Sequence, residues 1–394
     1  MKKSIELDLL IESVKVSLLG HPTNTIEALL KKEIDWHRLE KLAIFHAIRP
    51  VLSDTFQRIG FENSLSKELK TRTLTQSIFN LATNQELERL LDLLRKQGID
   101  VLPYKGVLFI SELYKNQQLR ETHDLDLLVQ PENAKKALEI LLEDGYTLDI
   151  KNPEKHDNEK IINSIFENPG FMEVGLDKKT KLGVDIHIDF HWHIKEEAHD
   201  FKVNFNEFFS DEETAINKAH KKTFVSPKTL FTMLLIHHGG RECWTRLKHF
   251  CDLIEFLKTT NLNKHELNQI AIELGMKRFF ETGMELYENE FRNIQTLNTE
   301  LSTVKQDIIK YWEIGKLWLR LDHRVRFTSI YFKLLDEKKS FRNFLASNYR
   351  YFSNPNLIEN PRLITFPNNY PFLNFISKII TFIWKKTIKN ILKV

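Results

Sequence analysis

The sequence predicts an α+β protein in which a small mixed-sheet α/β core is flanked by N-terminal and C-terminal helical regions. Apolar residues recur at helical spacing up to residue 97 and again beyond residue 195. Between these regions, short apolar runs alternate with helix-like stretches, which is typical of strand–helix–strand units. We expect four regions, at residues 1–97, 98–195, 196–350 and 351–394, the last a Pro-rich arm with a basic amphipathic helix.

Composition narrows the class of protein. A chain of 394 residues with 42% apolar and 28% charged residues is long enough for two or three domains with ordinary globular cores. A net charge of +3 gives no strong signal for a nucleic-acid partner. The two cysteines, Cys243 and Cys251, exclude a disulfide framework and indicate buried thiols. Acidic residues near the start argue against a signal peptide, and we expect a cytoplasmic protein.

The N-terminal region reads as helical. Apolar spacing predicts helices over residues 5–19 and 36–52, with Pro50 as a stop. A third helix over 77–97 carries a leucine stripe and ends at Gly98. Its stripe comprises Leu81, Leu87, Leu90, Leu91 and Leu94. We interpret His46 as structural, because nothing nearby in the sequence completes a site.

The pattern changes at residue 98. A strand, a Lys-Gly turn, a short helix, a second strand, a helix that begins at Pro131 and a third strand are predicted over residues 99–150. Residues 151–160 read as an exposed connection, and 171–174 as a strand. Beyond residue 200 we expect helices starting at Ser226-Pro227 and covering 244–257, 267–274 and 304–319, followed by an irregular stretch over 352–371.

The strongest functional signal is the acid pair in His123–Val129, HDLDLLV. Alternation places Asp124 and Asp126 on one face of a strand. The apolar residues that follow indicate a buried central strand, where two aspartates are costly without a cation. Upstream, Lys105-Gly106-Val107 forms a glycine turn at a helix start, which suits a phosphate. Together these features predict a Mg²⁺–nucleotide site.

Two-metal nucleotidyl transfer needs a third carboxylate. Residues 184–194, VDIHIDFHWHI, alternate with period two and offer Asp189 and Asp185 on one face. Either acid meets the requirement, and Asp189 is preferred. Lys105 and Arg120 carry the positive charge that a triphosphate needs.

The same strand supports an alternative. His187, His191 and His193 share the face of Asp189, and imidazole with carboxylate suits Zn²⁺. Same-face residues lie about 6.6 Å apart, so two of them reach one metal and a further ligand must come from elsewhere. His237-His238 is a candidate source. A zinc-dependent hydrolase is therefore a second hypothesis.

The last stretch, residues 372–394, combines apolar residues at helical spacing with lysines and no acid. Our preferred interpretation is that its apolar stripe packs on the protein body. The alternative is a peripheral contact with a membrane surface, which would make the protein membrane-associated.

These residues resemble an uncharacterised bacterial nucleotidyltransferase family of the DNA polymerase beta-like superfamily. The similarity rests on a Lys-Gly turn, an Arg before an Asp-x-Asp strand ending in Leu-Val, and a later Asp-x-His-Trp strand. They correspond here to Lys105-Gly106, Arg120, Asp124-Leu125-Asp126 with Leu128-Val129, and Asp189-Phe190-His191-Trp192. Residues 36–52 and the segment from His237 to Asp252 are also similar.

The resemblance implies a nucleotidyltransferase core in which Asp124 and Asp126 hold Mg²⁺, with two ions expected, and Asp189 is the third carboxylate. Gly106 and its neighbours would hold the phosphates. Val107 departs from the Gly-Ser or Gly-Gly of the wider superfamily and removes a hydroxyl. We expect transfer of a nucleoside monophosphate from an NTP to a small-molecule or protein acceptor. A non-catalytic nucleotide-binding or adaptor protein is the further alternative.

Overall fold

The computed structural model describes residues 3–149, 158–167, 172–180, 183–194, 201–210, 216–217, 222–223, 225–295, 301–314, 329–335, 342, 345–346, 349, 366 and 370–383. The expected mixed α/β class with flanking helices is confirmed. The chain divides into two compact units. The first comprises Met1–Asp92, Leu102–Asp126 and Phe201–Asp336, and the second comprises Leu93–Val101, Leu127–Asp200 and Glu337–Val394. The four-region division stays a prediction.

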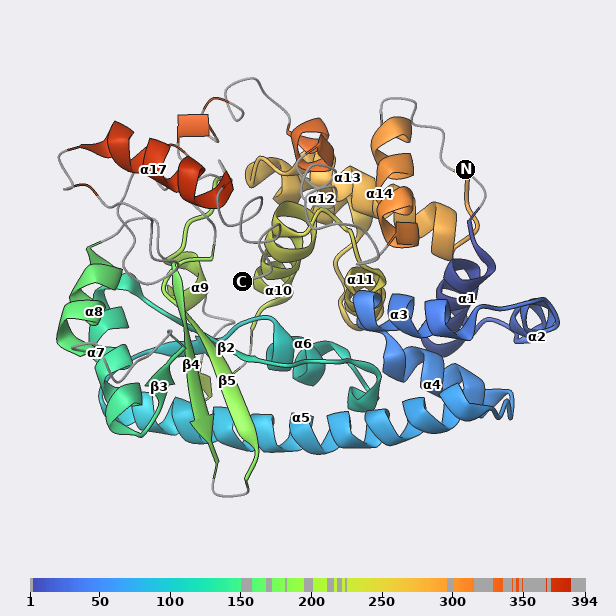
Figure 1. Ribbon diagram of the computed structural model, residues 1–394, viewed down its shortest axis with the longest axis horizontal. Helices are drawn as coiled ribbons and strands as arrows, with labels where there is room; N and C mark the ends of the chain where they lie inside the picture. Colours follow the sequence, from blue (N-terminus) through green and yellow to red (C-terminus); the bar gives the residue numbers. More distant parts are fainter. Residues whose placement is uncertain are drawn as a thin grey trace. The chain divides into compact units, whose positions relative to one another are not determined.

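The first unit is mainly helical. Its N-terminal helices are α1 (Ile5–Leu19), α2 (Asn24–Leu30), α3 (Trp36–His46), α4 (Arg49–Arg58) and most of α5 (Ser64–Lys96). Helix α1 begins after Ser4, whose hydroxyl accepts from the Leu7 amide at 3.2 Å. It packs against α3 and α4, which lie beside it in Figure 1.

Later segments complete this unit. They are α6 (Gly106–Leu113), the 3₁₀ turn η1 (Gln117–Leu119), α9 (Glu207–Ser210), the strand pair β6 (Ile216–Asn217) and β7 (Lys222–Thr223), α10 (Pro227–Leu234), the π-helix η4 (Leu235–Arg241), α11 (Leu247–Thr259), α12 (Lys264–Glu273), α13 (Lys277–Leu286), the π-helix η5 (Tyr287–Phe291) and α14 (Ser302–Ile314). Ser226 caps α10 as expected.

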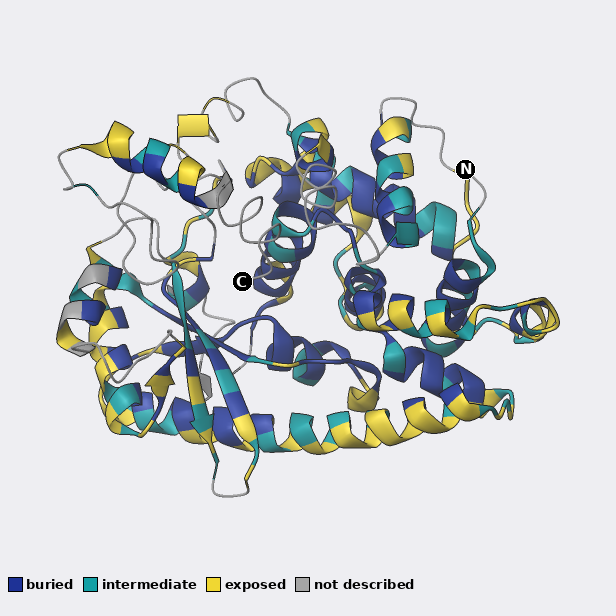
Figure 2. Cartoon of the chain, viewed as in Figure 1, coloured by how far each residue is buried: buried dark blue, intermediate teal, exposed yellow. Residues whose placement is uncertain are grey.

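Three local expectations for this unit are corrected. Pro50 lies in the first turn of α4 and starts a helix, since α3 has already ended at Ala47 with φ 51°. Helix α11 begins at Leu247 because Cys243 and Trp244 have φ values of 48° and 58°, which a helix excludes. Leu81 is 70% exposed, although the other four leucines of its stripe are buried. Figure 2 shows this exposed side of α5. Both cysteines are free and buried.

A five-stranded sheet has the order β1-β2-β5-β4-β3. The strands are β1 (Val101–Pro103), β2 (Leu125–Val129), β3 (Thr147–Leu148), β4 (Glu173–Lys179) and β5 (Asp185–His191). Strand β4 pairs antiparallel with β3 and β5, and β4 and β5 form the long hairpin in Figure 1. All five residues of β2 are buried and β2 is an interior strand, which confirms the expected central position.

Strands β3, β4 and β5 belong to the second unit, which also contains α7 (Pro131–Glu143), α8 (Asn158–Phe166) and α17 (Pro371–Ile383). Helix α8 starts inside the stretch expected to be an exposed connection, because Ile161, Ile162 and Ile165 give it a buried face. Residues 151–157, 315–319 and most of the Pro-rich stretch lie outside the described residues. On α17, Phe372 and Ile380 are 60% and 53% exposed, so the preferred expectation of a packed apolar stripe is wrong for this helix.

Candidate active site

The turn between β1 and α6 is the first element of the site. Lys105 has φ 53° and ψ −121°, a backbone conformation that side-chain-bearing residues rarely adopt. At Gly106, an added Cβ would lie 2.9 Å from Thr122 Oγ1 and 3.3 Å from Asp126 Oδ2. Only glycine therefore allows this close approach. The turn opens α6, whose first backbone amides have no partner within the helix and favour an anion.

The acid pair lies against this turn. Asp126 on β2 is 4% exposed, and Asp124, just before the strand, is half-buried. The Lys105 ammonium lies 3.0 Å from Asp126 Oδ1 and provides the cation that a buried carboxylate needs. The Thr122 hydroxyl donates to the Asp124 carbonyl at 3.2 Å, which fixes the segment entering β2.

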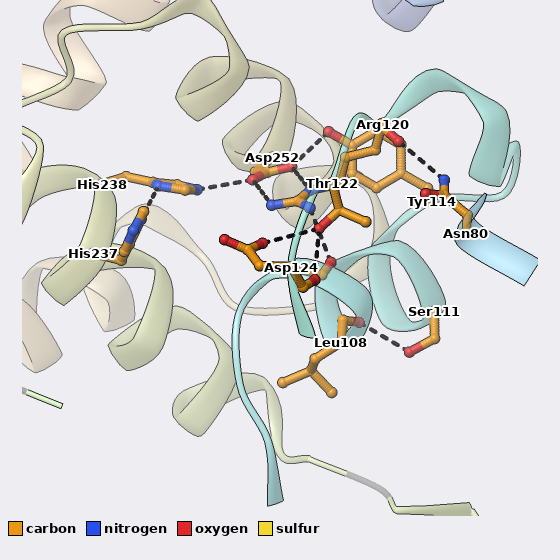
Figure 3. A network of polar contacts seen from close by, with 11 residues as sticks. Asn80, Leu108, Ser111, Tyr114, Arg120, Thr122, Asp124, His237, His238 and Asp252 are labelled. Carbon is orange, nitrogen blue, oxygen red and sulfur yellow. Dashed lines mark hydrogen bonds and ion pairs between the residues drawn. The ribbon is translucent and has the colours of Figure 1, made fainter. Parts of the chain in front are cut away.

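Arg120 joins the turn to the helical part of the same unit. Its Nη1 donates to the Gly106 carbonyl at 2.9 Å. Its Nε and Nη2 donate to Asp252 Oδ1 and Oδ2 at 2.8 and 3.0 Å, a bidentate pair from α11. Figure 3 shows the pair of Arg120 and Asp252. Arg120 is buried, and its guanidinium fixes the turn through the Gly106 carbonyl.

Asp252 is fully buried and accepts from two further groups. The Tyr114 hydroxyl donates to Oδ1 at 2.7 Å, and His238 Nε2 donates to Oδ2 at 2.9 Å (Figure 3). Burial alone would raise the pKa of Asp252, but the Arg120 guanidinium and the His238 hydrogen bond outweigh it and hold the pKa well below its ordinary value.

The histidines behind Asp252 are neutral. Burial lowers the pKa of His238 and, more strongly, that of His237. Since neutral His238 gives its Nε2 hydrogen to Asp252, its Nδ1 accepts from His237 Nδ1 at 2.9 Å. The chain of polar contacts therefore runs from η4 through α11 to the Gly106 turn.

The second unit carries the acids of β5. Asp189 is half-buried, lies opposite Gly175 on β4 and contacts His187 Nε2 at 3.2 Å. Asp185 is exposed and lies opposite Lys179. The hydrogen bond to Asp189, helped by one to Asp177, raises the pKa of His187 to about 9 despite partial burial. His187 is thus cationic at neutral pH.

The histidines on and just after β5 have separate environments. His191 is fully buried with Nδ1 2.9 Å from Glu173 Oε2, while His193 is exposed. Among the described residues, His187, His191 and His193 do not gather into one metal-binding group. Asp149, Asp177 and His187 do place ligand atoms within 4.8 Å of one another. Because a metal-binding histidine must be neutral, His187 has to lose its proton before this group binds a metal.

The structure therefore brings together Lys105, Gly106, Arg120, Asp124 and Asp126 within one unit and carries Asp185 and Asp189 in the other. Sequence reasoning missed the role of Asp252, Tyr114 and His238. A signal in the sequence was Asp252 itself, which lies within the apolar run of α11, because a buried acid requires a partner.

The fold is that of an α+β protein whose mixed sheet carries an acid pair beside a glycine turn. A family model described as "Uncharacterised nucleotidyltransferase" matches residues 32–292, roughly two thirds of the 394 residues. The chain belongs to this nucleotidyltransferase family. The matched range includes the Gly106 turn, both acid-bearing strands and Asp252. No curated protein and no solved structure matches the chain.

Proposed function

We propose that the protein is a Mg²⁺-dependent enzyme that transfers a nucleoside monophosphate from an NTP to an acceptor hydroxyl or phosphate. The observation that carries this proposal is the approach of the Gly106 turn to Asp126 and Thr122. It places a candidate phosphate-binding helix start directly beside a buried carboxylate. Membership of the nucleotidyltransferase family supports the reaction class.

In this proposal Asp124 and Asp126 bind the metal ions and Asp189 completes the set, with Asp185 as the alternative third acid. Carboxylate oxygens are the ligands that Mg²⁺ prefers. The sheet order supports Asp189, since β5 neighbours β2. Asp189 is half-buried, whereas Asp185 is exposed beside Lys179. Bound Mg²⁺ would supply Lewis-acid activation of the phosphate and of the acceptor oxygen.

The remaining residues have distinct proposed roles. The amides of Gly106 and Val107 bind phosphate oxygens at the start of α6. Lys105 neutralises Asp126 in the structure, and it turns to the triphosphate when metal and nucleotide bind. Arg120 acts on the phosphates through the turn, because Asp252 and the Gly106 carbonyl engage its guanidinium.

The test measures pyrophosphate release from each of the common NTPs with Mg²⁺ and a panel of hydroxyl- and phosphate-bearing acceptors. Asp126→Asn and Asp189→Asn should each lower the rate by about a hundredfold or more, since even residues that only support a metal ligand contribute tenfold to a hundredfold. Asp185→Asn and the control Asp100→Asn, at an exposed position, should retain activity. A fully active Asp126→Asn protein would sink the mechanism.

Two outcomes would favour the other functions. Mg²⁺-dependent NTP binding with no pyrophosphate release under any condition indicates a nucleotide-binding adaptor. Stoichiometric zinc in the purified protein indicates a zinc hydrolase, and loss of that zinc in His187→Ala would assign it to the Asp149, Asp177 and His187 group.

A further inference from the structure

Helix α17 turns its apolar side outward. Phe372, Leu373, Ile379 and Ile380 are 60%, 39%, 43% and 53% exposed. With Ile376 their spacing places them on one helical face. Asn374, Ser377 and Thr381 lie on the opposite face and are 0%, 5% and 5% exposed. A surface helix of a globular protein normally shows the reverse arrangement.

Specific contacts set this orientation. Asn374 Oδ1 accepts from the Phe366 amide at 3.0 Å, and Asn374 Nδ2 donates to the Phe366 carbonyl at 3.0 Å. The Phe375 ring packs on the Tyr349 ring with centroids 5.3 Å apart. The polar face is therefore held inward by hydrogen bonds, and the apolar face remains outward. Figure 2 shows exposed and buried residues along α17.

The charge in the sequence of this helix and of the residues after it has one sign. Every charged residue from 371 to 394 is a lysine, namely Lys378, Lys385, Lys386, Lys389 and Lys393. The whole chain carries only +3, so this segment concentrates positive charge. The described helix, Pro371–Ile383, is 13 residues long, about 20 Å, which is shorter than a bilayer crossing requires. None of the described helices has the length and apolar character that a membrane crossing requires.

We propose that α17 binds the surface of an anionic lipid bilayer, with its apolar face inserted among the headgroups. Exposed phenylalanine and isoleucine supply apolar area, and the lysines complement anionic lipid. A second copy of the chain fits this face less well, because pairing would bring two lysine clusters together. This surface is independent of the proposed catalytic site and would bring the enzyme to acceptors at a membrane.

The experiment is vesicle sedimentation of the full chain. Vesicles of neutral phosphatidylcholine are compared with vesicles that also contain anionic phosphatidylglycerol. The protein should sediment with the anionic vesicles, and its binding should weaken at high salt. The double variant Ile379→Ser/Ile380→Ser should bind about tenfold or more weakly. The variant Lys385→Gln/Lys386→Gln should lose the preference for anionic lipid.

The matched control is Leu74→Ser/Ile78→Ser on α5, which removes two apolar residues that are more exposed (63% and 57%) elsewhere on the chain. It should sediment like the unaltered protein. Equal binding by the Ile379→Ser/Ile380→Ser variant, or no sedimentation of the unaltered protein with anionic vesicles, overturns the proposal. So does a lipid-free oligomer that the same variant dissociates, because the face would then belong to a second copy.

Discussion

Asp252 accepts two hydrogen bonds from Arg120, at 2.8 and 3.0 Å, although the two residues are 132 positions apart in the sequence. The third guanidinium contact of Arg120 is the Gly106 carbonyl. A fully buried carboxylate on α11 thus positions the turn that we propose binds phosphate. We therefore expect Asp252 to act as a positioning residue, because its link to the Gly106 turn runs through Arg120.

Asp252→Asn should weaken both stability and nucleotide binding. Asparagine keeps the shape but removes the charge that balances buried Arg120, so the free energy of unfolding should fall by about 3 kcal/mol or more. With Arg120 no longer fixed, the Gly106 turn loosens and Mg²⁺–NTP affinity should fall. Urea unfolding and nucleotide titration at a temperature where the variant is folded measure the two effects.

Asp100→Asn serves as the control, since Asp100 is exposed and should tolerate the change. Unaltered Mg²⁺–NTP affinity in folded Asp252→Asn, together with lower stability, would restrict Asp252 to a role in the fold.

Gly106→Ala should weaken both nucleotide binding and stability. The added methyl would lie 2.9 Å from Thr122 Oγ1, so the turn or the acid-bearing segment must shift. Overpacking of this kind costs about 1–3 kcal/mol, and we expect Mg²⁺–NTP affinity to fall about tenfold or more. Isothermal titration with a non-hydrolysable NTP analogue measures the change.

A second substitution separates the steric cause from other causes. Thr122→Ala removes Oγ1, the atom nearest to the added methyl. The double variant Gly106→Ala/Thr122→Ala should therefore lose less Mg²⁺–NTP affinity than the sum of the two single losses. Strict additivity of the two single effects would argue against the close approach as the reason for glycine.

His46 should make the first unit sensitive to acid. Its Nε2 donates to the Trp312 carbonyl at 3.1 Å, and its Nδ1 accepts from the Leu247 amide at 3.1 Å, so it links α3, α14 and α11. Burial lowers the pKa of His46 from 6.5 to about 3. Protonation would place a hydrogen on Nδ1 against the Leu247 amide and break that bond.

The direction in which pH changes the free energy of unfolding follows from the lowered pKa of His46. His46 takes up a proton near pH 6.5 in the unfolded chain but stays neutral in the folded chain. The stability that neutral His46 contributes is therefore fully present above pH 6.5 and is lost as pH falls toward 3. The loss is up to about 1.4 kcal/mol per pH unit. Urea unfolding between these limits should show a steeper decline for the unaltered protein than for His46→Gln. Parallel curves for the two proteins would contradict the prediction.

Local chemistry made much of the fold predictable. The period-two pattern of residues 184–194 and the apolar end of β2 predicted strands that the structure contains. Ser226 predicted the start of α10 through its capping hydroxyl. Boundaries were less predictable where packing decides them. Pro50 starts a helix instead of ending one, and Trp244 adopts a left-handed conformation while its indole donates to the Phe279 carbonyl at 2.7 Å.

The sequence by itself determined the glycine turn, the acid pair and the third-acid candidates, because spacing along a strand or turn places neighbouring side chains on known faces. Only the tertiary structure decided that Arg120 pairs with Asp252 and that His46 links three helices. It also decided which side of α17 faces outward, since spacing reveals two faces but no burial. Such pairings join residues far apart in the chain, and local periodicity carries no information about them.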